Sequence, residues 1–285
     1  MFNSECDVMK KYKTLTISIL FIFIIAILQG CSTTTDSISS TARTIVKEQL
    51  IVGMSLSFPP FETTDEKGTP SGLSVDLAKD LGDYLNLEVK IENLPYDSLI
   101  SAVKDKKVDV VISSLPITSE REAIVDFSNP YANIKFSLLL SQTSDIENLK
   151  DIALKGRPLA VKDGSLGHIY AKEKLSGTKL AVFSSDKEAV EAVISGKVGG
   201  YLQDEISIYK NWNLYPLATK INFNVGDFAQ SWGIAISKDN SQLKDEINLF
   251  LEEYNKKGGF SSLTEKYLSK ALDNYKEWGI PFIFD

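Results

Sequence analysis

Short apolar runs alternate with segments of helical periodicity, and this alternation occurs twice along the chain. The first set has the apolar runs LIVGMS, EVKIENL and VDVVIS, separated by the helical patterns GLSVDLAKDLGDYL and SLISAVK. The second set has PLAVKDG, LAVFSS and VGGYLQD, separated by SLGHIYAKEKL and DKEAVEAVISGK. Such alternation is typical of parallel sheets with helices on both faces. The sequence therefore predicts an α/β protein with two lobes.

The loops that follow the predicted strands carry aromatic rings, hydroxyl groups and three Asp residues, and Arg121 follows one of them. They read MSLSFPPF, NLPYDS, SSLPIT, KDGSLG and LQDE. In sheets of this type, ligands bind beyond the carboxyl ends of the strands. If the strand ends of the two lobes face each other, we expect a ligand cleft between them.

The N-terminus has the pattern of a secretory signal. The basic segment MKKYK, residues 9–13, precedes an apolar run from Leu15 to Leu28. This run of about 14 residues is shorter than the roughly 20 that span a bilayer, so residues 1–30 are predicted to be a signal peptide. The run ends in LQGC, which resembles the bacterial lipobox and implies lipidation of Cys31. A plain signal peptide or an N-terminal anchor helix also fits, and either Met1 or Met9 can be the start.

Residues 31–44, with the polar stretch STTTDSISST, are predicted to form a flexible tether. Because the only cysteines are Cys6 and Cys31, no disulfide, thiol nucleophile or cysteine metal cluster is expected in the fold. No cofactor or metal is predicted. The net charge of -7, without a basic patch in the body of the chain, argues against a nucleic-acid partner.

Three segments resemble the signatures of one family, and the similarity as a whole extends over about residues 45–272. FPPFETTDEKGTPSGLSVDLAKDL resembles the opening of the family 3 extracellular solute-binding proteins, which are the amino-acid receptors of ABC importers. VDVVISSLPITSEREAIVDFSNPY resembles the second signature of that family. YLQDEIS resembles the third, in which an Asp follows the last strand of the second lobe.

The resemblance implies a periplasmic-binding-protein type II fold, in which two α/β lobes, each with a mostly parallel sheet, are joined by two hinge crossings. Lobe 1 would comprise residues 45–135 plus 230–285, and lobe 2 residues 136–229. The crossings would lie near Lys135–Leu140 and Asp227–Gly233. The implied protein is a monomeric, lipid-anchored extracytoplasmic receptor, and not an enzyme. It would bind a free amino acid and deliver it to an ABC permease.

A receptor for free amino acids needs a donor for the ligand carboxylate. Arg121 is one of few arginines among 31 basic residues, and the family places its carboxylate-binding Arg here. A guanidinium offers two parallel N–H bonds, which Lys does not. The strand-end hydroxyls of Ser113 and Ser114 are expected to contact the charged head of the ligand. Thr118 is a natural helix N-cap, and its capping would fix the position of Arg121.

Asp204 is the predicted ammonium acceptor, because it follows VGGYLQ where the family has its ammonium-binding Asp. An ordinary helix cap is the alternative. Ser165 begins a predicted helix, and its backbone N–H could be a second carboxylate donor or simply part of a cap. Phe58 and Tyr96 match positions at which the family holds the ligand side chain between two rings, although core aromatics would give the same pattern.

Two positions depart from the family pattern. Relatives that bind basic amino acids carry an Asp three residues before the first ring, where this chain has Ser55. A buried cation without a partner would cost several kcal/mol, so we expect a neutral, polar amino acid as ligand. Pro116 also lacks the N–H that other residue types would offer there. Two alternatives stay open, namely a cyclohexadienyl dehydratase-like enzyme on the same scaffold and a ligand sensor without transport.

Overall fold

The computed structural model describes residues 44–223, 225 and 229–284. The predicted signal peptide, Cys31 and all but the last residue of the tether lie outside these ranges. Part of the predicted crossing Asp227–Gly233 also lies outside them. Among the helices of the described ranges, none combines the length and the hydrophobicity that a membrane span requires.

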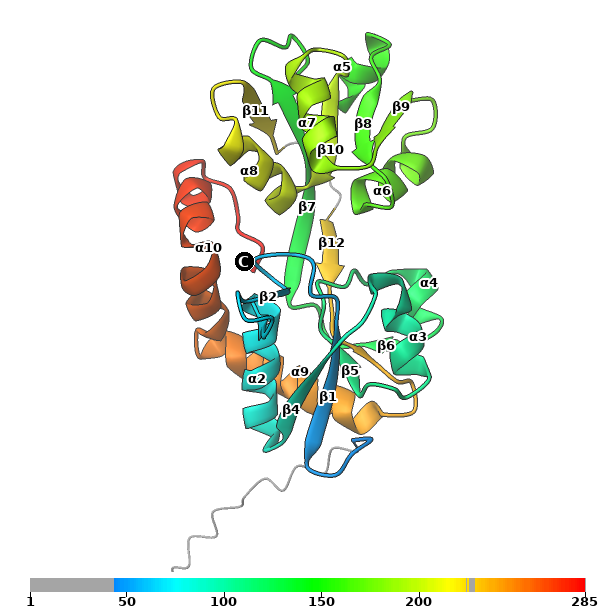
Figure 1. Ribbon diagram of the computed structural model, residues 1–285, viewed down its shortest axis with the longest axis vertical. Coiled ribbons are helices and arrows are strands. Elements are labelled where there is room, and N and C mark those ends of the chain that lie inside the picture. The colour runs from blue at the N-terminus through cyan, green and yellow to red at the C-terminus, as the bar shows by residue number, and fades with distance from the viewer. Residues whose placement is uncertain (1–43, 224, 226–228, 285) are drawn as a thin grey trace, which may run out of the picture. The chain divides into compact units, whose positions relative to one another are not determined.

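The first sheet has five strands in the order β4-β1-β5-β13-β6 (Figure 1). Strands β1 and β4, and β1 and β5, are parallel, whereas β13 runs antiparallel to both β5 and β6. The bounds of these strands are Gln49–Met54 (β1), Glu88–Asn93 (β4), Val110–Val111 (β5), Asp126–Phe127 (β6) and Ala235–Ile236 (β13). A separate two-stranded sheet pairs β2 (Thr63–Thr64) with β3 (Pro70–Ser71).

Successive strand residues point to opposite faces of a sheet. In the first sheet both faces carry apolar side chains, and helices cover both. Leu50 and Val52 belong to one apolar cluster and Ile51 belongs to another. The larger cluster takes in α2, α9 and α10, and the smaller one takes in α3. The helices of this part are α2 (Leu73–Leu85), the 3₁₀ turn η1 (Tyr96–Ser98), α3 (Leu99–Lys104), α4 (Ser119–Glu122), α9 (Ser241–Lys256) and α10 (Gly259–Glu277).

The second sheet has the strand order β11-β7-β10-β8-β9, and β12 also pairs with β7. Strands β10, β8 and β9 are parallel, and β7 is antiparallel to β10 and β11. The elements of this part are β7 (Ala132–Ser141), α5 (Leu149–Leu154), β8 (Leu159–Lys162), α6 (Leu166–Lys174), β9 (Leu180–Phe183), α7 (Asp186–Ile194), β10 (Gly200–Asp204), α8 (Glu205–Leu214), β11 (Thr219–Asn222) and β12 (Ala229–Trp232).

Strand β7 takes part in two different pairings. Its residues Ala132–Lys135 pair with β12, and those from Phe136 onward pair with β10 and β11. The change of partner falls at the start of the predicted crossing Lys135–Leu140. The lobe boundaries themselves stay a prediction.

The predicted alternation of strands and helices is confirmed, with two differences. The parallel strands of each sheet lie toward one of its edges, and the antiparallel strands β13 and β7 lie next to them. The predicted strand VDVVIS pairs only over Val110–Val111, although its neighbours Val108 and Ile112 are also buried.

The C-terminal tail packs on the larger cluster of the first sheet. Phe282 and Ile283 are buried, and the ring of Phe284 stacks on Phe260 with 5.1 Å between centroids. The backbone N–H of Asn133, in β7, donates to the carbonyl oxygen of Ile283 at 2.8 Å. The tail is therefore part of the core, which its sequence alone did not reveal.

Candidate functional site

Arg121 lies in the short helix α4, and three contacts fix it. Its backbone N–H donates to Thr118 Oγ1 at 3.3 Å, so Thr118 is the N-cap of α4. Its Nη1 donates to the carbonyl oxygen of Pro116 at 2.8 Å. Its guanidinium carbon lies 5.7 Å from the ring centroid of Tyr96, within the range of a cation–π contact. The bond to Pro116 uses one of the five N–H donors of the guanidinium, so other N–H groups can donate to a ligand carboxylate.

Pro116 is itself held by a short antiparallel bridge. It pairs with Trp232, and the neighbouring Ile117 N–H donates to the carbonyl oxygen of Ser231 at 2.9 Å. The carbonyl that Arg121 contacts therefore belongs to a residue whose two neighbours, Leu115 and Ile117, are held by backbone hydrogen bonds. A proline suits this position because only its carbonyl is needed.

Ser55 and Ser113, which lie beyond the ends of β1 and β5, are directly bonded. The backbone N–H of Ser55 donates to Ser113 Oγ at 3.0 Å, and both residues are buried. The Oγ atoms of Ser55 and Ser57 lie 3.1 Å apart. The structure thus brings these predicted ligand contacts together at the carboxyl edge of the first sheet.

Ser114 is bonded to a buried carboxyl group that the sequence did not single out as part of the site. Its Oγ lies 2.9 Å and 3.1 Å from the two oxygens of Glu62, and Ser74 Oγ donates to the same carboxyl. Gly72 makes this arrangement possible, because its φ is 123° and a Cβ there would lie 2.3 Å from the carbonyl oxygen of Phe61. The sequence FPPFE contained Glu62, but its burial depends on contacts from residues 12 and 52 positions further on.

The environment of Glu62 favours its protonated form. Burial raises the pKa of the Glu62 carboxyl to about 8, although the hydrogen bonds from Ser74 and Ser114 oppose the shift. Burial also raises the pKa of Tyr131 well above its usual value, with the charge of Glu62 as the second cause.

The two predicted ring contacts differ in their surroundings. Phe58 is half-buried, stacks on Phe61 at 5.3 Å and meets Trp232 edge-on at 6.4 Å. Tyr96 is 37% exposed and lies beside Arg121. Trp232 is only 2% exposed and belongs to the large apolar cluster. The ring of Phe58 thus packs against two other aromatic rings, whereas the ring of Tyr96 is partly exposed to solvent.

The remaining predicted residues lie at the carboxyl ends of β8 and β10 in the second sheet. Asp204 is buried and caps α8, accepting from the Ser207 N–H at 2.8 Å. Burial raises the pKa of Asp204. Gln203 joins this cap to α6, because its Oε1 accepts from the N–H groups of Gly167 and Asp204, each at 3.2 Å.

Ser165 caps α6 through its side chain, which accepts from the His168 N–H at 3.2 Å. Its backbone N–H, the predicted second carboxylate donor, donates to the Lys162 carbonyl at 3.1 Å. That amide is therefore engaged within the turn, and the capping interpretation describes the observed contacts.

Glu205, next to Asp204, is a second buried carboxyl group. Its Oε1 accepts from the Lys135 N–H at 3.1 Å, and its Oε2 has no hydrogen-bond partner among the described residues. Burial raises the pKa of Glu205 to about 7. The family resemblance selected Asp204 of these adjacent acids, but it did not indicate that Glu205 is buried as well.

The predicted site residues thus form two groups, one on each sheet. The first contains Arg121, Thr118, Phe58, Tyr96 and the three serines, and the second contains Asp204 and Ser165. Within the described ranges, no hydrogen bond or ring contact joins the groups, so their action on one ligand is a proposal. No cluster of three or more metal-binding side chains is found in this part of the chain.

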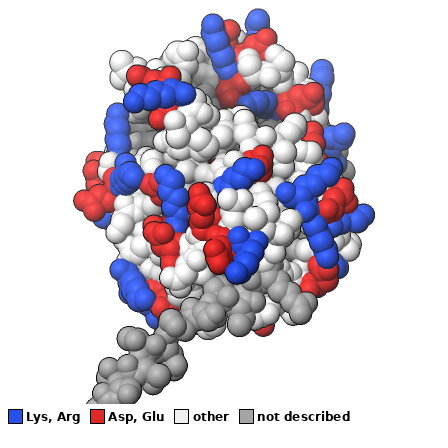
Figure 2. Space-filling view, turned by 60° about the horizontal axis from the view of Figure 1, so that its bottom comes forward, with Lys and Arg blue, Asp and Glu red and all other residues white. Residues whose placement is uncertain are grey.

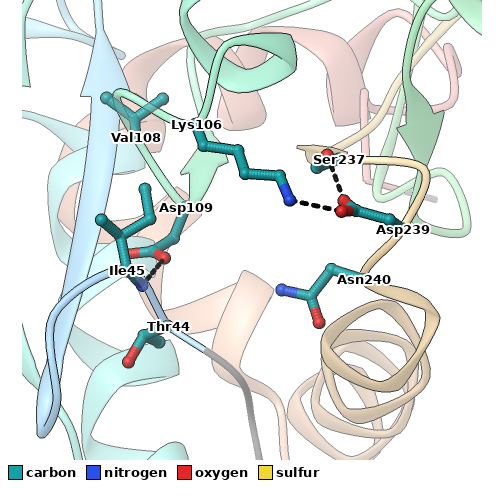
Figure 3. Close-up of a pocket in the computed structure, with 8 residues that line it drawn as sticks. All are labelled: Thr44, Ile45, Lys106, Val108, Asp109, Ser237, Asp239 and Asn240. Carbon is teal, nitrogen blue, oxygen red and sulfur yellow. Dashed lines mark hydrogen bonds and ion pairs between the residues drawn. The ribbon is translucent and has the colours of Figure 1, made fainter.

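A cavity of about 200 Å³ lies at the opposite edge of the first sheet (Figure 3). Its lining includes Ile45, the ion pair of Lys106 with Asp239, and Asp109, whose carboxylate accepts from the Ile45 N–H at 2.6 Å. None of the predicted site residues lines it. On the face shown in Figure 2, basic and acidic side chains are interspersed, so that face has no large patch of one sign.

Comparisons with known proteins identify the family. The L-arginine-binding protein of Pseudomonas aeruginosa is 27% identical over 76% of this chain and 87% of its own length. An ancestral arginine-binding protein, solved bound to glutamine, is 32% identical with a TM-score of 0.62, over 78% of this chain and 99% of the other.

A third relative is the ancestral amino-acid-binding protein AncCDT-1, described as a precursor of cyclohexadienyl dehydratase. It is 29% identical with a TM-score of 0.63, over 77% of this chain and 95% of the other. The family model of the bacterial extracellular solute-binding proteins, family 3, matches residues 50–270. With its two α/β sheets and the polar residues at their carboxyl edges, the chain belongs to the bacterial extracellular solute-binding proteins, family 3.

Proposed function

We propose that the protein is an extracytoplasmic receptor that binds a free, neutral and polar amino acid and delivers it to an ABC import permease. The observation that carries this proposal is the placement of Arg121. Its guanidinium is oriented by the Pro116 carbonyl and lies beside the ring of Tyr96, near Ser113 and Ser114 in sequence and on the same sheet edge. A fixed guanidinium is the group that best matches a carboxylate in both charge and geometry.

The other half of an amino acid is an ammonium group, for which Asp204 is the proposed acceptor. Its buried carboxyl caps α8, where Oδ1 accepts from the Ser207 N–H, and we propose that the same carboxyl accepts from the ligand ammonium. A bound ammonium would lower the pKa of this acid by opposite charge. A micromolar dissociation constant corresponds to about 8 kcal/mol, which an Arg–carboxylate fork, an ammonium–Asp pair and two rings can supply.

The preference for a neutral ligand rests on Ser55. This buried residue contacts Ser57 and Ser113 and provides no negative charge for a cationic side chain. Relatives named for arginine are similar to this chain, so arginine is the necessary comparison. If calorimetry shows that arginine or lysine binds far more tightly than neutral amino acids, the proposed specificity is wrong.

Membrane attachment through a lipid on Cys31, and a monomeric state, complete the proposal. Replacing Cys31 with Ser should release the mature protein from the membrane fraction. Deletion of the gene should reduce the uptake of a labelled amino acid by cells if the protein is a transport receptor, but not if it is a ligand sensor. If a variant that no longer binds the amino acid still supports normal uptake, the transport role is contradicted.

The main experiment is a thermal-shift screen of the twenty amino acids, cystine and small relatives. A ligand present at 100 times its dissociation constant should stabilise the folded protein by about 2.7 kcal/mol. Arg121→Ala should abolish this shift. If that variant responds as the wild type does, Arg121 is not the carboxylate-binding residue.

A second candidate function has one observation in its favour. Glu62 is a buried carboxyl group with a pKa of about 8, which suits a general acid near neutral pH. Incubation with prephenate or arogenate would test for elimination of water from a ring substrate. Product formation that disappears in Glu62→Gln would support an enzyme instead of a receptor.

A further inference from the structure

Glu62 is a buried acid at the candidate site for which a binding role has not been assigned. Only 1% of its surface is exposed, and its carboxyl lies between the hydroxyls of Ser74, in α2, and Ser114, beyond β5. Ser114 has a φ of 45°, in the left-handed region that non-glycine residues seldom adopt. Such a conformation persists only when surrounding contacts hold it, and the Glu62 carboxyl contacts Ser114 through both oxygens.

The residues on either side of Ser114 belong to the proposed ligand site. Ser113, one residue earlier, is bonded to the Ser55 backbone. Pro116, two residues later, provides the carbonyl that Arg121 contacts. We therefore expect that a change in the hydrogen bonding between Glu62 and Ser114 shifts both Ser113 and Pro116.

The groups that face Glu62 carry no positive charge to balance an anion, although the hydrogen bonds from Ser74 and Ser114 partly stabilise one. They are the hydroxyls of Ser74 and Ser114, and the phenols of Tyr131 and Tyr96, on which its charge acts. Arg121 contacts Tyr96, and no ion pair joins Glu62 to a basic residue in the described ranges. A buried anion without a cation is costly.

We infer that Glu62 is a positioning residue that must carry a proton for tight ligand binding, so that binding of the amino-acid carboxylate is coupled to protonation of Glu62. This inference rests on the proposed receptor function. The neutral carboxyl holds Ser114 without placing a second negative charge beside the ligand carboxylate. Because burial raises the pKa of Glu62 to about 8, the coupling becomes measurable in the mildly alkaline range.

The test is calorimetric titration with L-glutamine and L-arginine between pH 6 and pH 9. Affinity should be constant at the acid end and should fall by up to about tenfold per pH unit above the Glu62 pKa. Titration in two buffers with different ionisation enthalpies should show net proton uptake on binding at pH 8.5. The contribution of the ligand ammonium is subtracted from a titration of the free amino acid.

Glu62→Gln keeps the shape of the side chain and removes its titration. The fall in affinity and the Glu62 share of the proton uptake should disappear in this variant. Glu66→Gln is the matched control, because Glu66 is an exposed acid in the following loop, and it should behave as the wild type does. If Glu62→Gln retains the wild-type pH profile, the inference is wrong.

The buffer comparison on the wild type decides the matter even if the variant does not fold. Absence of net proton uptake at pH 8.5, with binding still detected, overturns the inference and leaves the receptor function standing. If none of the twenty amino acids gives heat at pH 7, the receptor function fails and the inference fails with it.

Discussion

The Nη1 atom of Arg121 donates a hydrogen bond of 2.8 Å to the carbonyl oxygen of Pro116, five residues earlier. This bond orients the guanidinium, and the bridge between Pro116 and Trp232 fixes the carbonyl in turn. A lysine at position 121 cannot keep the backbone bond and also present two parallel donors to a carboxylate. The geometry therefore accounts for an arginine at this position.

We predict that Arg121→Lys weakens amino-acid binding by at least about tenfold and that Arg121→Ala weakens it by about 100-fold or more. Isothermal titration with the best ligand of the screen measures both effects. Arg157→Lys is the matched control, since Arg157 Nη1 also donates to a backbone carbonyl, that of Gly196, but lies in the turn between α5 and β8, away from the candidate residues. Equal effects at the two arginines would mean that Arg121 is only structural.

Asp204→Asn separates the two roles of Asp204. Asn is as good an N-cap as Asp, so the bond to the Ser207 N–H and the stability of α8 should be retained. The variant lacks the negative charge for the ligand ammonium, so binding should weaken by about 30-fold or more. Circular dichroism and thermal unfolding check the fold, and titration checks binding. Unchanged affinity would leave Asp204 as a helix cap alone.

Ser55→Asp tests what excludes a cationic ligand. A carboxylate at this buried position would provide a partner for a basic side chain, so we expect the ratio of arginine affinity to glutamine affinity to rise by about tenfold or more. Ser261→Asp is the control, because Ser261 is exposed on α10 and the substitution introduces the same charge away from the candidate residues. The hypothesis fails if Ser55→Asp leaves the ratio of the two affinities unchanged.

The sequence predicted the elements of the fold well where periodicity was clear. The helical pattern that begins after Gly72 became α2, and the apolar run at residue 50 became β1. It predicted less well where long-range contacts decide the outcome. The antiparallel position of β13, the burial of Glu62 and the packing of the tail all depend on residues far away in sequence.

The candidate site shows the same division. Motifs were sufficient to select Arg121 and Asp204, since strand-end loops and the family resemblance marked both. They could not show that the Ser165 N–H is used within its own turn. They also could not show that Trp232 is buried behind Phe58, because both findings depend on how loops meet in three dimensions.

The two buried glutamates should make the ligand-free protein less stable as the pH rises. Burial raises the pKa of Glu62 to about 8 and that of Glu205 to about 7, from the usual value of 4.5. The folded state therefore binds protons more tightly than the unfolded state. This contribution is complete below about pH 4.5 and is lost as the pH rises through 7 and 8, at up to about 1.4 kcal/mol per pH unit for each group.

Thermal unfolding between pH 6 and pH 9 measures this effect. Glu62→Gln should flatten the upper part of the profile, and Glu205→Gln should flatten the lower part. Glu88→Gln, at an exposed acid in β4, should leave the shape unchanged. Profiles that run parallel for wild type and both buried-site variants would show that neither carboxyl is protonated in the folded state.

The last prediction concerns the C-terminal tail, whose residues Phe282 and Ile283 are 5% and 0% exposed. Phe282→Ala and Ile283→Ala should each lower the free energy of unfolding by about 2–5 kcal/mol, because each removes buried apolar atoms and leaves a cavity. Urea unfolding gives the change from the midpoint, provided that the slope stays constant. Leu249→Ala, at a position on α9 that is 55% exposed, is the control and should change stability by no more than about 0.5 kcal/mol. Comparable small losses at all three positions would show that the tail does not contribute to the core.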